Sequence, residues 1–182
     1  GGNIYALAGN TSGVIRATGV SEKDGKVWLT AGTNGLVNVS GGTVAANAAN
    51  AANGDGGAIS VTGGQIRVDA GATLDASATA ASGNGGTILA IADMTAGRLS
   101  FQGTALAKGG SQGGNGGFVE TSGAAVDFNG ARIDTSAAAG KGGNWLIDPY
   151  NLTIDAGAAS TISTNLASTS VTLQTTASGT SA

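Results

Sequence analysis

The stretch GGFVETSGAAVDFNGARID, residues 116–134, contains one copy of the pattern that decides the fold. Two glycines open it, and three short runs of alternating residues follow. In the middle run Val126 and Phe128 are apolar, while Asp127 between them is charged. Because residues two apart on a strand point to the same side, this alternation indicates a short strand with one buried face.

The same pattern recurs along the chain at a loose period of roughly 30 residues. The copies open at Gly2, Gly25, Gly57, Gly86, Gly117 and Gly143. The second residue after each of these glycines is apolar: Ile4, Val27, Ile59, Ile88, Val119 and Trp145. A position that stays apolar through every copy predicts one buried column that runs through all of them.

A second and a third run extend each copy. The second run has two apolar columns, which are Ile15, Val37, Ile66, Leu99, Val126 and Leu152, and, two residues on, Ala17, Val39, Val68, Phe101, Phe128 and Ile154. The column between them is polar: Arg16, Asn38, Arg67, Ser100, Asp127 and Thr153. In the third run an apolar residue follows a glycine by three positions, at Val44, Leu74, Leu106 and Ile133.

Three short strands per copy, with the same residue class at the same place, predict one coil of a parallel β-helix. We therefore expect an all-β solenoid with about three strands per coil and roughly six to seven coils. Residues 1–157 would form the coils, and residues 158–182 a Ser/Thr-rich continuation as a further, irregular coil. The glycines are expected at corners and in loops, where they supply positive φ.

Two other interpretations stay open at this point. A sandwich of hairpins would also be all-β, although it would not require the same column in every copy. A chain with 34 glycines could instead be a disordered Gly/Ala linker. Helix is disfavoured throughout, because glycine and β-branched residues recur with a period of two.

The composition argues against several classes of function. The chain has no cysteine and no histidine, which removes disulfides, the commonest zinc ligands and the commonest general base. Charged residues make up 10% of the chain without a basic run, so nucleic-acid binding is not expected. No apolar stretch approaches the roughly 18 residues of a membrane span, so membrane insertion is not expected either. We expect no enzyme activity, no catalytic residue, no metal and no cofactor.

Two segments carry a family resemblance. GNGGFVETSG (114–123) and GKGGNWLIDPYNLTI (140–154) resemble filamentous haemagglutinin-type exoproteins of two-partner secretion. The residues that match the family's motifs are Gly117, Phe118, Val119, Glu120, Thr121, Trp145, Leu146, Asp148, Pro149 and Asn151. The resemblance implies structural roles for these residues, in a right-handed β-helix.

The same resemblance implies a large fibre on the bacterial outer surface. Its members are secreted through an outer-membrane β-barrel partner and act in cell adhesion, aggregation, biofilm or filament formation. The family's secretion domain with its Asn-Pro-Asn-type motif is missing here, so the transporter would be engaged by a region outside this chain. Cell-surface or matrix glycans and proteins are further expected partners. Neither end of the sequence shows a capping element, which predicts either a longer native chain or end-to-end association of copies.

Four groups of residues are candidate sites. Asp75 and Asp134 share an outward column two coils apart, with Ala107 between them, and suggest a carbohydrate-active β-helix enzyme as the alternative function. Tyr5 and Trp28 occupy the same outward position on neighbouring coils and suggest a surface contact. Asp55 stands in a glycine-rich loop like those of calcium-binding repeats. Three sequons, at Asn10, Asn38 and Asn151, permit glycosylation.

Overall fold

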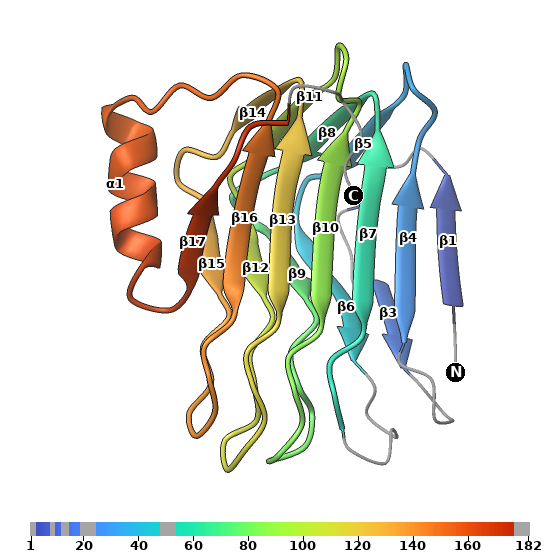
Figure 1. Ribbon diagram of the computed structural model, residues 1–182. Helices are drawn as coiled ribbons and strands as arrows, with labels where there is room; N and C mark the ends of the chain where they lie inside the picture. The colour runs from blue at the N-terminus through green and yellow to red at the C-terminus, as the bar shows by residue number, and fades with distance from the viewer. Residues whose placement is uncertain (1–2, 8–9, 12–14, 19–24, 48–53, 177–182) are drawn as a thin grey trace.

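The computed structural model describes residues 3–7, 10–11, 15–18, 25–47 and 54–176. Within these ranges the strands form three parallel sheets. Sheet A, on the near side in Figure 1, contains β1 (Asn3–Leu7), β4 (Lys26–Thr30), β7 (Ala58–Gly63), β10 (Thr87–Ala92), β13 (Phe118–Gly123), β16 (Asn144–Pro149) and β17 (Ser170–Leu173). Every neighbouring pair in it is parallel and in register.

Sheets B and C form the far side of the molecule. Sheet B contains β2 (Asn10–Thr11), β5 (Leu36–Val39), β8 (Gln65–Val68), β11 (Arg98–Phe101) and β14 (Ala125–Asp127). Sheet C contains β3 (Ile15–Thr18), β6 (Gly42–Asn47), β9 (Ala72–Asp75), β12 (Thr104–Leu106) and β15 (Arg132–Asp134).

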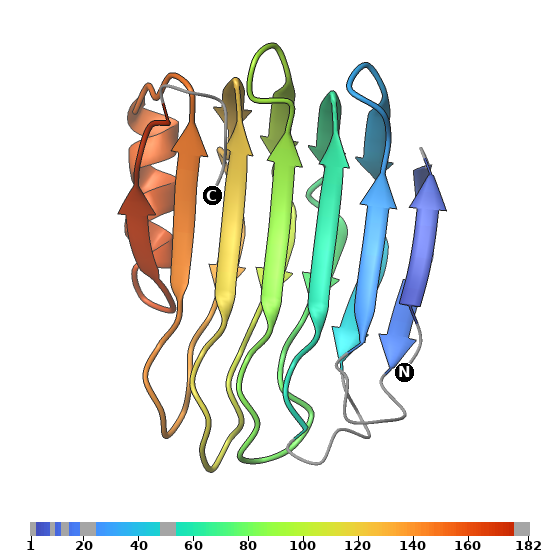
Figure 2. The ribbon, with the colours of Figure 1, turned by 45° about the vertical axis from the view of Figure 1, so that its right-hand side comes forward.

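The chain therefore winds as a right-handed parallel β-helix with three strands per coil, which confirms the predicted fold class (Figures 1 and 2). The described strands make five complete coils, since sheets B and C each have five strands. Sheet A continues for two more strands, β16 and β17. Among the described residues, sheets B and C have no strands at the corresponding level of the solenoid. Neighbouring strands of a sheet lie about 4.8 Å apart, which sets the rise of each coil.

The predicted first column fills the interior. Val27, Ile59, Ile88, Val119 and Trp145 lie in consecutive register and are all 0% exposed. The other two sheets contribute aliphatic residues and Phe101 to the same core. Apolar burial of this kind is the main stabilising contribution of a solenoid whose coils each contact only their neighbours. In the first copy Ile4 is paired with Val27, but its side chain lies outside the described part of the structure.

Two predicted columns are wrong in detail. Ile15 is paired with Val44 in sheet C and not with Val37 in sheet B. An alternating run looks the same in either sheet, so only its pairing partner distinguishes the two positions. In the third column Ala105, and not Leu106, is paired with Leu74. The turn from β11 to β12 is shorter than the turn from β8 to β9, which moves the buried position by one residue.

The last predicted copy of the second run is also wrong. Residues 150–155 form no strand, and Ile154 is 42% exposed instead of buried. Leu152 is partly buried against the core without joining a sheet. The chain leaves the solenoid here because Asp155 is the N-cap of α1 (Ala156–Asn165), where its Oδ1 accepts the Ala158 N–H at 2.8 Å.

Helix α1 corrects the expectation that the chain contains no helix. Its buried residues are Ala158, Thr161 and Asn165, which fall on one face and pack toward β15. After α1 the chain returns to sheet A as β17, in register with β16. The division of the chain at residue 157 stays a prediction; the position falls within α1, and β17 follows it.

Glycine recurs at the start of the copies for a different reason from the predicted one, which was positive φ. Among the glycines of the described ranges, positive φ occurs at Gly42, Gly54, Gly114 and Gly130. Four of the glycines that open the copies form a glycine column, in which each is packed against the backbone of the coil before: Gly57, Gly86, Gly117 and Gly143. A Cβ on Gly117 would lie 2.0 Å from the Gly86 carbonyl oxygen, and one on Gly143 would lie 1.9 Å from that of Gly117. No side chain fits between the coils at this column.

Replacing Gly117 by alanine is therefore expected to lower the free energy of unfolding by about 1–3 kcal/mol, because the backbone of two coils must separate to admit the methyl group. The matched control is Gly142→Ala, since a Cβ at Gly142 meets nothing within 4 Å. Urea denaturation followed by circular dichroism measures both variants. Equal effects of the two substitutions would show that close packing is not the reason for glycine at position 117.

Candidate functional surfaces

Tyr5 and Trp28 are paired in register on β1 and β4, as the repeat predicts. Trp28 is half-buried. The side chain of Tyr5 lies outside the described part of the structure. Their role as a surface contact stays a prediction.

Asp75 and Asp134 lie in one register column at the ends of β9 and β15. The residue between them is Leu106, which corrects the predicted Ala107. Each aspartate accepts the backbone N–H two residues on, from Ser77 and Ser136, both at 2.9 Å. Such contacts form tight turns at the ends of strands.

The surroundings of Asp134 favour the ionised form of its carboxyl group. Burial opposes its ionisation, but hydrogen bonds from Ser136 and the charge of Lys108, 3.5 Å away, lower its pKa below the ordinary value. A catalytic acid of a glycosidase needs the opposite, a raised pKa. This observation does not favour the alternative enzyme function.

Asp55 begins a ladder of side chains along the loops between sheet C and sheet A. Its Oδ1 accepts the backbone N–H of Asn84, Asn84 Oδ1 accepts that of Asn115, and Asn115 Oδ1 accepts that of Lys141. Each side chain therefore ties its loop to the next coil. No group of three or more acidic residues suited to a metal ion occurs in the described ranges.

Six of the ten residues that carry the family resemblance are buried, and their structural roles stay a prediction. Val119, Thr121 and Trp145 point into the core, where the indole Nε1 donates to Thr121 Oγ1 at 3.0 Å. Phe128 contacts the Trp145 ring edge-on, with the centroids 5.5 Å apart. The motif's Gly117 stands in the glycine column, and Pro149 ends β16 opposite Gly123. Phe118 and Leu146 are half-buried, and Asn151 is exposed.

Glu120 and Asp148 lie on the outer face of sheet A but are buried. The Ser122 hydroxyl donates to Glu120 Oε1 at 2.7 Å. Asp148 Oδ2 accepts Gln174 Nε2 at 3.2 Å and Thr176 Oγ1 at 2.6 Å, so it fastens the segment after β17 to the sheet. No sequence pattern predicts this contact, because Gln174 and Thr176 stand outside the repeat.

The sequons differ in accessibility. Asn151 is exposed in the irregular segment after β16, whereas Asn38 is half-buried on β5 with its Oδ1 buried. Asn10 is paired with Asn38 on β2. Glycosylation at these positions stays a prediction.

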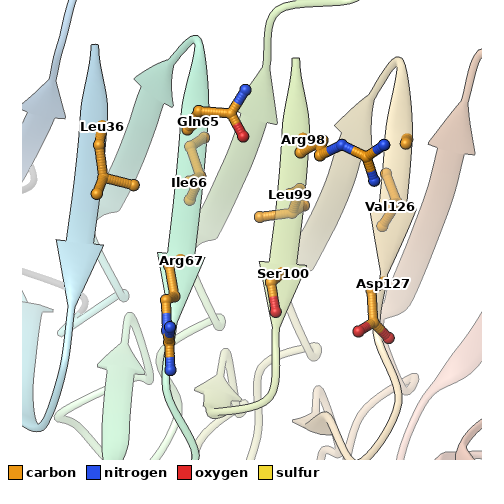
Figure 3. A pocket seen from close by; sticks show the side chains of 10 residues that line it. Leu36, Gln65, Ile66, Arg67, Arg98, Leu99, Ser100, Val126 and Asp127 are labelled. Carbon is orange, nitrogen blue, oxygen red and sulfur yellow. The ribbon is translucent and has the colours of Figure 1, made fainter.

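A groove of about 380 Å³ crosses the outer face of sheet B. The repeat pattern of the sequence did not predict it. Outward side chains from four consecutive strands line it in two rows (Figure 3). The first row is Leu36, Gln65, Arg98 and Ala125, and the second includes Arg67, Ser100 and Asp127. The residues of the second row belong to the polar column found in the sequence. The first row could be placed beside them only from the strand register in the structure.

The end of sheet C is closed by α1. The Asn165 side chain, 4% exposed, accepts the Ile133 N–H through Oδ1 at 2.6 Å and donates through Nδ2 to the Ala131 carbonyl at 2.9 Å. Ser168 continues the edge, since its hydroxyl donates to the Ile133 carbonyl and its own carbonyl accepts the Thr135 N–H. The Asn165 amide thus replaces a peptide group of a further strand. This corrects the expectation that neither end carries a capping element.

Comparison with family models, curated proteins and solved structures gives no match. In the part of the chain that the structure describes, no helix has the length and hydropathy needed to cross a membrane.

Proposed function

We propose that this chain is a segment of a large, secreted, fibrous surface protein, in which it serves as a structural and adhesive β-helical shaft. The observation that carries the proposal is the continuity of contacts along the solenoid axis. Sheet A runs in register from β1 to β17, and the glycine column and the Asp55 ladder join successive coils outside the strands. A stack of this kind gives length and stiffness, and its outer faces present side chains at regular spacing.

The family resemblance supports the secreted part of the proposal. The matched residues are those that hold the coils together, such as Gly117 in the glycine column and Trp145 in the core. The proposal includes export through an outer-membrane β-barrel transporter, engaged by a region outside this chain. It also includes adhesion, aggregation or biofilm formation as the biological outcome.

Two measurements on the source organism test the proposal. Antibodies against the 182-residue protein should label intact cells, and the reactive species should have a mass many times the 17.2 kDa of this chain. Labelling that appears only after the cells are permeabilised would contradict surface location. A mass near 17.2 kDa would contradict the role as one segment of a long shaft.

A further inference from the structure

We propose that the groove on sheet B binds a linear polysaccharide that carries carboxylate groups, a polyuronate. The inference rests on the adhesive part of the proposed function and adds to it a site and a ligand class.

The direction of the groove selects a linear polymer. Leu36, Gln65 and Arg98 stand on β5, β8 and β11 at equivalent register positions, so the row runs along the solenoid axis and across the strands. Strand spacing places successive side chains about 4.8 Å apart. An extended sugar chain has a residue repeat of similar length, so consecutive sugars would meet equivalent positions on consecutive coils.

The backbone beneath the groove is not available to a peptide ligand. Strands β8 and β11 are each paired on both sides, with β5, with each other and with β14. A peptide that binds by strand addition needs an unpaired edge, which the middle of this sheet does not offer. The ligand must therefore be recognised by side chains that stand on the sheet.

The charge of the two rows favours an anionic ligand. Arg98 is exposed and has no part in the ion pairs found among the described residues, and its guanidinium extends toward β14 in Figure 3. Arg67 faces the same groove and is paired with Asp69. Gln65 and Ser100 add uncharged donors, and among the described lining residues Asp127, at one end, is the one carboxylate. A guanidinium offers two parallel N–H groups that match a planar carboxylate, which a uronic acid supplies on each residue.

The apolar part of the lining is aliphatic. Leu36, 51% exposed, stands at one end of the first row, and none of the described residues that line the groove is aromatic. A site for uncharged sugars would be expected to present an aromatic ring for stacking. The groove therefore relies on its arginines for affinity, with Leu36 contacting the C–H face of a sugar.

The experiment measures binding of the intact 182-residue protein to polygalacturonate by biolayer interferometry. Fully methyl-esterified polygalacturonate is the matched ligand, because it keeps the polymer backbone and removes the charge. We expect binding to the acid form that weakens with added salt, and at least tenfold weaker binding to the ester. The Arg98→Ala variant should lose roughly tenfold or more in affinity for the acid form, and Arg98→Lys should recover part of it.

The control variant is Arg132→Ala, which removes another exposed arginine, this one from sheet C. It should bind the acid form like the unmodified protein, with the circular dichroism spectrum of all variants unchanged. Absence of binding, equal binding of the ester, or equal losses from Arg98→Ala and Arg132→Ala would each overturn the inference. Those results would leave surface labelling and native mass untouched, so failure of the ligand class is distinguishable from failure of the proposed function.

Discussion

Replacing Trp145 by alanine is expected to lower the free energy of unfolding by about 3–5 kcal/mol, the range for removing a large buried aromatic side chain. Trp145 is 0% exposed and the largest of the fully buried side chains among the described residues. The substitution removes its packing against Phe128 and leaves Thr121 Oγ1 without the indole donor. Urea denaturation at constant pH, followed by circular dichroism, measures the loss.

Two comparisons separate packing from the hydrogen bond. Trp145→Phe keeps most of the apolar contact but not the N–H group, so it should cost about 1–3 kcal/mol. Tyr150→Ala removes an aromatic side chain that is 47% exposed and should change stability by no more than about 0.5 kcal/mol. A Trp145→Ala loss as small as that of Tyr150→Ala would mean that the sixth strand of sheet A does not close the core.

Replacing Asn165 by leucine is expected to lower the free energy of unfolding by about 2–6 kcal/mol, because two buried backbone groups lose their partner at about 1–3 kcal/mol each. These groups are the Ile133 N–H and the Ala131 carbonyl on the outer edge of β15. The variant also leaves that edge able to pair with another strand. Denaturation measures the loss, and light scattering after size-exclusion chromatography measures association.

Asn165→Asp refines the test, since it keeps an acceptor for the Ile133 N–H and loses the donor to Ala131. Its loss of stability should be smaller than that of the leucine variant. Asn151→Leu is the control, because Asn151 is exposed and lies away from the β15 edge. If Asn165→Leu remains as stable and as monomeric as Asn151→Leu, α1 does not cap sheet C.

The cap bears on how the solenoid can continue. Sheet C is closed at β15 by side chains from α1 and the residues after it. Sheet A instead extends past α1 to β17, where Leu173 is 45% exposed. Any further strand added at this end would therefore pair with β17 in sheet A, while α1 would have to move before sheet C could grow.

The fold class followed from the sequence because the signal was repeated. One apolar column, from Val27 to Trp145, recurred in copy after copy, and each copy confirmed the others. A parallel solenoid places identical positions on top of one another, so periodicity in the sequence becomes stacking in space. That is why the strand order and the buried face of sheet A were predictable without any structural information.

Other features depended on contacts that no local pattern records. The sequence could not assign Ile15 to sheet C or choose Ala105 over Leu106, because alternation is the same in any sheet and corner lengths vary. The sequence showed where the glycines recur but not why. The reason is the close approach of the backbone of one coil to that of the next. The groove, the cap formed by Asn165 and the burial of Asp148 join residues from different coils or from outside the repeat. The sequence by itself determined the repeat and its buried face through local alternation, whereas the register between coils, and with it every surface that spans several strands, was decided by tertiary packing.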